Sequence, residues 1–235
     1  MSDLTAPPLN PLPPVIWALA LPMIFVELAA NAGANGMIGG PAAIGWRAQW
    51  MQIFGFAPDY LRWMIETSTY PLDGLTRLIT YPLVHQDVTH ALFVIVILLA
   101  LGKFVGEIYR WWALLATWAL ATVAGALAYA TVPYAQAGLL GGYPGVYGLI
   151  GAYSFLLWVR LTGTGENNLR AFQLIGFLLA LQVIFAVVGI VIYGVEQGTT
   201  WDFVADIAGF VTGFVLAFVV SPGGWSRVLA KVRAH

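Results

Sequence analysis

Long apolar segments alternate along the chain with shorter stretches that hold most of its polar and charged residues. A helix of about 17 to 25 predominantly apolar residues can cross a bilayer. Six segments have this length: residues 15–34, 89–105, 112–132, 143–159, 172–193 and 203–220. The pattern therefore predicts an all-α, polytopic membrane protein, built as a bundle of six transmembrane helices.

The connection between the first two predicted spans, residues 36–80, is long and has a composition of its own. Its sequence WRAQWMQIFGFAPDYLRWMIE mixes aromatic residues, Met and Arg at near-helical spacing. Such a pattern predicts short amphipathic helices that lie in the membrane interface. Two uses of this first loop remain open: a lid packed on the bundle, or a docking surface for another membrane protein.

The remaining segments divide the chain into a proline-rich N-terminal tail (residues 1–14), one membrane domain (15–222) and a basic C-terminal tail (223–235). The first segment lacks the Lys or Arg of a signal peptide, so we expect the first span to be a true transmembrane helix.

The positive-inside rule predicts the orientation, because Lys and Arg accumulate in cytoplasmic segments. With the N-terminus in the cytoplasm, seven of the ten basic residues lie inside: Lys103, Arg110, Arg160, Arg170, Arg227, Lys231 and Arg233. Arg47, Arg62 and Arg77 lie in the first loop, on the other side. We expect a multi-pass protein of a plasma membrane, the bacterial inner membrane, with both termini cytoplasmic.

Composition excludes several classes of protein. Hydrophobic residues make up 60% of the chain and charged residues only 9%, whereas a soluble domain carries about 25% charged residues. A formal net charge of −1 gives no basic field for a nucleic acid. Without cysteine, disulfides and thiolate chemistry are impossible. No cofactor motif is present, and neither a cofactor nor a metal is expected.

Three motifs on successive predicted spans resemble the rhomboid family of intramembrane serine proteases: TRLITYPLVHQDVTH, GGYPGVYGLIGAY and ADIAGFVTGF. In the first motif, Arg77, His85 and His90 match the Arg and the two histidines at the entry to the family's second span. The resemblance covers residues 15–220, and it implies a rhomboid-like bundle with a long first loop.

The resemblance also implies where a catalytic Ser, its His base and an oxyanion-binding Asn would stand. Tyr143, Asp206 and Val94 occupy these positions, and a shift of one residue puts Pro144 at the Ser position. A phenol with an ordinary pKa near about 10 beside a weak carboxylate base makes a poor nucleophile. Ser154 lies 11 residues past Tyr143, about 16 Å along a helix. The resemblance thus points to a member without the Ser–His dyad.

The fourth and sixth predicted spans also carry glycines and one carboxylate, Asp206, near the positions just described. Glycines let helix backbones approach closely, and those expected to do so are Gly141, Gly142, Gly145, Gly148 and Gly151 on the fourth span and Gly209 and Gly213 on the sixth. An unpaired carboxylate within a membrane costs about 2.5–3.5 kcal/mol. We therefore expect Asp206 to form a hydrogen bond with Tyr143; alternatively, it faces a wet vestibule together with Asp202.

Other polar residues near the predicted first loop have structural interpretations. His85 and His90 are five residues apart and do not share one helix face, so metal ligation is not expected. We expect the two histidines to hydrogen-bond the first loop and Arg77 to anchor it. Glu27 in the first span either reaches the interface or pairs with an Arg of the first loop.

The sequence thus predicts a rhomboid-like protein that binds transmembrane clients without cleaving them, or that serves as an accessory subunit of a membrane protein complex. Its partners would be the lipid bilayer and other integral membrane proteins, met through the first loop or through lipid-facing helices. The alternative is an active rhomboid-type serine endopeptidase. A transporter would require repeat symmetry and more polar residues in the spans, and neither is evident.

Overall fold

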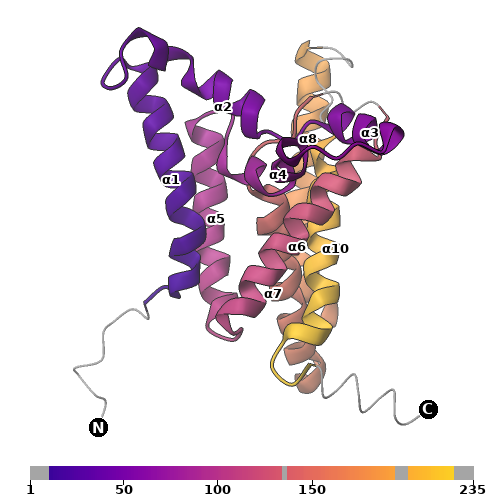
Figure 1. Cartoon of the computed structure of the whole chain (residues 1–235). Helices are drawn as coiled ribbons and strands as arrows, with labels where there is room; N and C mark the ends of the chain where they lie inside the picture. The colour runs from indigo at the N-terminus through magenta and orange to yellow at the C-terminus, as the bar shows by residue number, and fades with distance from the viewer. Residues whose placement is uncertain (1–10, 134–136, 194–200, 225–235) are drawn as a thin grey trace, which may run out of the picture.

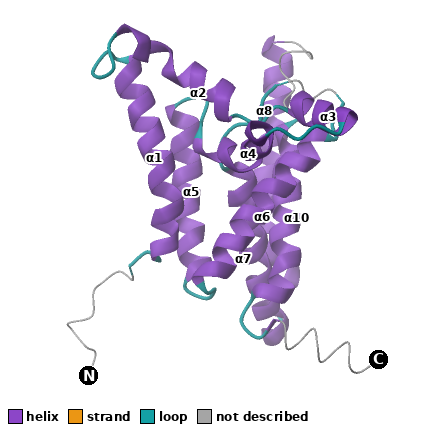
Figure 2. Cartoon of the chain, in the orientation of Figure 1, coloured by secondary structure: helices purple, strands orange, loops and turns teal. Residues whose placement is uncertain are grey.

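The computed structural model describes residues 11–133, 137–193 and 201–224, and this part of the chain is helical, with no strand (Figures 1 and 2). Within it, six helices are long and apolar enough to cross a membrane. They are α1 (Pro14–Ala34), α5 (Val88–Gly106), α6 (Trp111–Ala130), α7 (Tyr143–Thr164), α8 (Gln173–Tyr193) and α10 (Asp202–Val220). The predicted fold class is confirmed. The one notable difference in length is α7, which continues five residues past the predicted end at 159.

The first loop forms short helices that lie across one end of the bundle, called the loop end below (Figure 1). They are η1 (Pro41–Gly45), α2 (Trp46–Phe54), α3 (Pro58–Thr67), α4 (Leu72–Thr80) and η2 (Tyr81–Leu83). Proline occupies the first turn of η1, α3 and η2, where its missing N–H would have no helical partner. α3 ends at Ser68, whose left-handed backbone closes the helix.

Two arginines hold the first loop in place: Arg77 joins two parts of the loop to each other, and Arg62 joins the loop to the end of α6. Arg77 donates to the carbonyl oxygens of Gln52 at 2.7 Å and Gly55 at 2.9 Å. Arg62 donates to the carbonyl oxygens of Ala130 at 3.1 Å and of Val132 at 2.6 Å, just past the end of α6. These donors satisfy carbonyls that helix ends leave without partners. Arg77 therefore anchors the first loop, the role that the sequence indicated.

α7 is the centre of the bundle, because it packs against α5, α6 and α10, while α1 pairs with α5. In an apolar 18-residue window of α7, 61% of the residues are buried, compared with 6% for the corresponding window within Asn168–Ile192, the segment that η3 and α8 share. Within the described residues, α8 packs extensively only with η3 (Asn168–Phe172), the short helix that precedes it. The fifth span is thus attached to the bundle mainly at one end.

Glycines bring α7 and α10 into backbone contact. A Cβ on Gly209 would collide with the carbonyl oxygen of Pro144, and one on Gly213 with that of Gly148. Only residues without a side chain permit this separation, as at other small-residue crossings of membrane helices. The crossing fixes the first two turns of α7 against the middle of α10.

Candidate functional site at the start of α7

The turn that precedes α7 is held by Gly141. Its N–H donates to the carbonyl oxygens of Tyr81 at 3.1 Å and Val84 at 2.9 Å, and its φ is +81°. A Cβ here would lie 2.6 Å from Nε2 of His90. Both the left-handed backbone and the lack of space therefore require glycine. The turn sets the first residue of α7 beside the histidines that precede and begin α5.

Tyr143, the first residue of α7, lies against one of these histidines. Its ring stacks on His90 with centroids 5.1 Å apart and planes inclined by 17°. His90 in turn meets His85 edge to face, at 5.4 Å and 90°. The carboxylate of Asp87 caps α5 by accepting from the backbone N–H of His90 at 2.9 Å. Three rings thus form a continuous stack from α7 to the loop before α5.

Asp206 has a different partner from the expected one. It accepts a hydrogen bond from Nε2 of Gln182 on α8 at 2.6 Å, and none connects it to Tyr143 within the described part of the chain. The reason is that the Tyr143 ring is engaged with His90, while α8 brings an amide to the depth of Asp206. Asp206 is only 4% exposed, which also argues against a position in a wet vestibule.

Apart from Gln182, tyrosine hydroxyl groups surround Asp206. Its carboxyl interacts electrostatically with the hydroxyl groups of three tyrosines from η2 and α7, namely Tyr81, Tyr143 and Tyr147. Tyr81 itself donates to the carbonyl oxygen of Thr122 at 2.9 Å. Asp206 is therefore enclosed by neutral hydrogen-bonding groups of α7, α8 and η2.

His85 forms a hydrogen bond with the first loop through its backbone carbonyl. Its carbonyl oxygen accepts from Nη1 of Arg47 at 3.0 Å. The ring is 1% exposed, and neither ring nitrogen has a hydrogen-bond partner among the described residues. Burial, with a smaller contribution from His90, lowers the pKa of His85 to about 4. The imidazole is consequently neutral at physiological pH.

The buried Glu27 pairs with an Arg of the first loop, one of the two possibilities that the sequence left open. Nη1 of Arg47 donates to Oε2 at 3.0 Å and Nη2 to Oε1 at 2.5 Å. Asn31, one turn further along α1, donates to Oε1 at 2.7 Å. Glu27 is 7% exposed. The bidentate pair with Arg47 and the hydrogen bond from Asn31 therefore supply the donors that water would give an exposed carboxylate. The pair joins α1 to α2.

The groups that serine proteolysis requires are not assembled in the described residues. The buried Ser154 hydroxyl, further along α7, has no hydrogen-bond partner there. At the position of the oxyanion donor, Val94 is fully buried, and a Cβ on Gly142 would meet its Cγ1 at 3.1 Å. No three His, Cys, Asp or Glu side chains in the described part lie close enough to hold a metal ion. In the described part of the chain, the site is a packed cluster built from Tyr143, His90, Asp206 and Gln182.

Sequence reasoning missed Gln182, although a signal was present. Between Gln173 at its start and Tyr193 at its end, α8 carries no other polar side chain. A lone amide in an apolar span is costly unless it has a hydrogen-bond partner, so it indicates one on a neighbouring helix. Asp206, the carboxyl that needed a donor, was the natural candidate.

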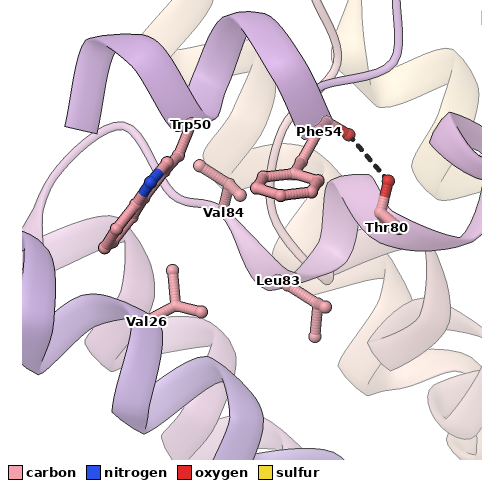
Figure 3. Close-up of a pocket in the computed structure, with 6 residues that line it drawn as sticks. All are labelled: Val26, Trp50, Phe54, Thr80, Leu83 and Val84. Carbon is pink, nitrogen blue, oxygen red and sulfur yellow. Dashed lines mark hydrogen bonds between the residues drawn. The ribbon is translucent and has the colours of Figure 1, made fainter. Parts of the chain in front are cut away.

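An apolar cavity of about 350 Å³ lies apart from this cluster, between α1, α2 and η2 (Figure 3). Its walls are Val26, Trp50, Phe54, Thr80, Leu83 and Val84. The one hydroxyl among them, on Thr80, already donates to the carbonyl oxygen of Phe54 at 3.1 Å. The cavity therefore has an apolar lining without a free polar side chain, and it is separate from the cluster around Tyr143 and Asp206.

Six spanning helices, a helical first loop and a polar cluster at a close glycine crossing define a polytopic membrane protein with a site enclosed by its spans. The chain belongs to the rhomboid family, because the model of the rhomboid domain matches residues 73–223, more than half of its length. The match begins in α4 and runs past the end of α10. None of the curated proteins compared with the chain matches it.

Proposed function

We propose that this rhomboid is a non-catalytic binder of transmembrane segments in other membrane proteins. The observation that carries the proposal is the content of the site: Tyr143 stands at the start of α7, stacked on His90, and Asp206 is hydrogen-bonded to Gln182. The protein resides in a plasma membrane, with both termini in the cytoplasm and the loop end outside.

Hydrolysis requires a nucleophile, a base at hydrogen-bonding distance and donors for the oxyanion. α10 contains no histidine, and the two described histidines lie on the α5 side of Tyr143. Ser154 is the nearest serine of α7, eleven residues from Tyr143. These positions support a binding function over peptide-bond cleavage.

The weak attachment of α8 supports the binding of a transmembrane helix. No residue from 176 to 192 is fully buried, and α8 exposes a series of large apolar side chains: Phe177, Val183, Ile184, Phe185, Val187, Val188, Val191 and Ile192. In a bilayer such a surface is covered by lipid or by another helix. A span this loosely packed gives a client access to the bundle from within the membrane.

A second candidate function is that of an accessory subunit bound through the first loop. Leu72, Leu75 and Ile79 are exposed on α4 at spacings of three and four residues. They form one apolar face, which suits an interfacial helix or a protein contact. Trp63 and Ile65 extend the exposed apolar surface onto α3.

Two measurements on the protein purified in mild detergent test the proposal. A fluorophosphonate probe, which phosphonylates activated serines with loss of fluoride, should leave the protein unlabelled, whereas labelling that heat denaturation abolishes would establish an active serine hydrolase. Co-purification with mass spectrometry separates the two binding functions. Many substoichiometric membrane proteins are expected for a client binder, and one stoichiometric complex would favour the accessory subunit.

A further inference from the structure

α8 is held to the bundle over its first half. At the end away from the first loop, the Phe172 ring of η3 contacts Phe214 and Phe210 of α10, with centroids 5.6 and 6.5 Å apart. Leu174, Leu178 and Leu179 pack against the core of the bundle. Ten residues beyond Phe172, Gln182 donates to Asp206. From there to residue 192 no residue is fully buried, so the hydrogen bond of Gln182 lies at the edge of the packed part of α8.

The attachment at Gln182 is incomplete. Nε2 donates to Asp206, but Oε1 is enclosed without a hydrogen-bond partner in the described part of the chain. An enclosed acceptor without a donor costs free energy that a single hydrogen bond only partly offsets. A side chain that offers donors and no acceptor would fit the carboxyl of Asp206 better than the amide does. Lys and Arg are such side chains.

The charge around Asp206 also favours a cation. Asp202 lies one helical turn from Asp206 on the same face of α10, beside Tyr129. The ion pairs of the described residues join Arg47 to Glu27, Arg62 to Asp59 and Arg170 to Glu166, so neither carboxyl of α10 has a basic partner there. Intramembrane carboxyl groups are usually paired with one another or with a basic residue.

We propose that Asp206, with Asp202 one turn away, recognises a Lys or Arg side chain in the transmembrane helix of a client, which displaces the amide of Gln182. This inference rests on the proposed binding of transmembrane segments and names the class of segment bound. Asp206 is the fifth residue of α10, about 6 Å from the start of that helix at the loop end. The basic residue of the client therefore lies in the third of its span nearest the loop end.

The experiment uses two Leu-rich transmembrane peptides, one with a single Lys in the outer third of its span and one with Leu there. The full-length chain has no native cysteine, so Gly163→Cys, at an open position near the end of α7, provides one site for a fluorophore. Energy transfer in phosphatidylcholine vesicles then reports binding of a labelled peptide. Wild type should bind the Lys peptide about 3- to 20-fold more tightly, the range of interhelical polar contacts in membranes.

Three variants test whether the preference for the Lys peptide depends on Asp206 and Gln182. Asp206→Asn should abolish the preference for Lys, so that the two peptides bind with similar affinity. Gln182→Leu, which removes the competing amide, should strengthen binding of the Lys peptide severalfold. Glu166→Gln removes an exposed carboxylate outside the site and should change neither affinity. Thermal unfolding of each variant shows whether it is folded. If Asp206→Asn does not fold, the affinities of Gln182→Leu for the two peptides still test the proposal.

The possible failures are distinct. Equal binding of both peptides by wild type and by Gln182→Leu would overturn the recognition of a basic residue and leave the proposed function standing. Binding of neither peptide by wild type would overturn the proposed function itself.

Discussion

The Tyr143 ring lies nearly flat on the His90 ring, with centroids 5.1 Å apart and planes inclined by 17°. This contact joins the first residue of α7 to the first turn of α5 and fills the space beside the Gly141 turn. The residue at the place of the family's nucleophile therefore packs against a neighbouring helix. Its contribution should be visible in the stability of the fold.

Tyr143→Ala should lower the free energy of unfolding by about 1 kcal/mol or more, because aromatic pairs contribute roughly 0.5–1.5 kcal/mol beyond the area they bury. Tyr143→Phe keeps the ring and removes the hydroxyl, so it serves as the matched control and should retain most of the stability. Thermal unfolding in one detergent compares the variants. Equal losses for Ala and Phe would locate the stabilisation in the hydroxyl and not in the stack.

Gly213→Ala on α10 should destabilise the protein more than an alanine at an open position of α7, because its Cβ would collide with the carbonyl oxygen of Gly148. The helices must separate, and overpacking of this kind costs about 1–3 kcal/mol. Gly163→Ala is the control, since a Cβ there meets open space and alanine favours helix. Unfolding midpoints of the two variants check the difference, and similar midpoints would show that the crossing of α7 and α10 is looser than the structure shows.

The sequence was sufficient to predict the six spans and the helices of the first loop, since both follow from apolar length and local spacing. It was insufficient for the partner of Asp206. That choice depends on the depth at which α8 carries Gln182 and on the direction of the Tyr143 ring, neither of which local periodicity encodes. For the same reason the sequence did not indicate which atom of His85 would bond to the first loop; the backbone carbonyl accepts from Arg47.

The partner of Glu27 could be predicted in part from the sequence. A carboxylate in the first span had to be paired or exposed, and the first loop offered three arginines. The tertiary structure selected Arg47, because α2 begins just above the end of α1 that carries Glu27 (Figure 1). Charge thus indicated the kind of partner, and only the fold of the first loop identified the residue.

Arg47→Ala should therefore destabilise the protein by more than about 2 kcal/mol, because it leaves the buried carboxylate of Glu27 with Asn31 alone. Arg170→Ala removes the exposed ion pair with Glu166 and should cost only about 0.3–0.5 kcal/mol. Denaturation in mixed micelles, followed by tryptophan fluorescence, compares the two. A loss for Arg47→Ala as small as that of the control would mean that water reaches Glu27.

The buried His85 should make the fold sensitive to acid. Its pKa is about 4 in the folded protein and about 6.5 in an unfolded chain, so the unfolded state binds the proton first as the pH falls. The stabilisation is complete above pH of about 6.5 and is lost progressively as the pH falls toward 4, by up to about 3 kcal/mol. His85→Gln cannot titrate, so its unfolding midpoint should depend less on pH between 7 and 4.5 than that of wild type. Equal pH dependence in both proteins would show that a group other than His85 controls the acid response.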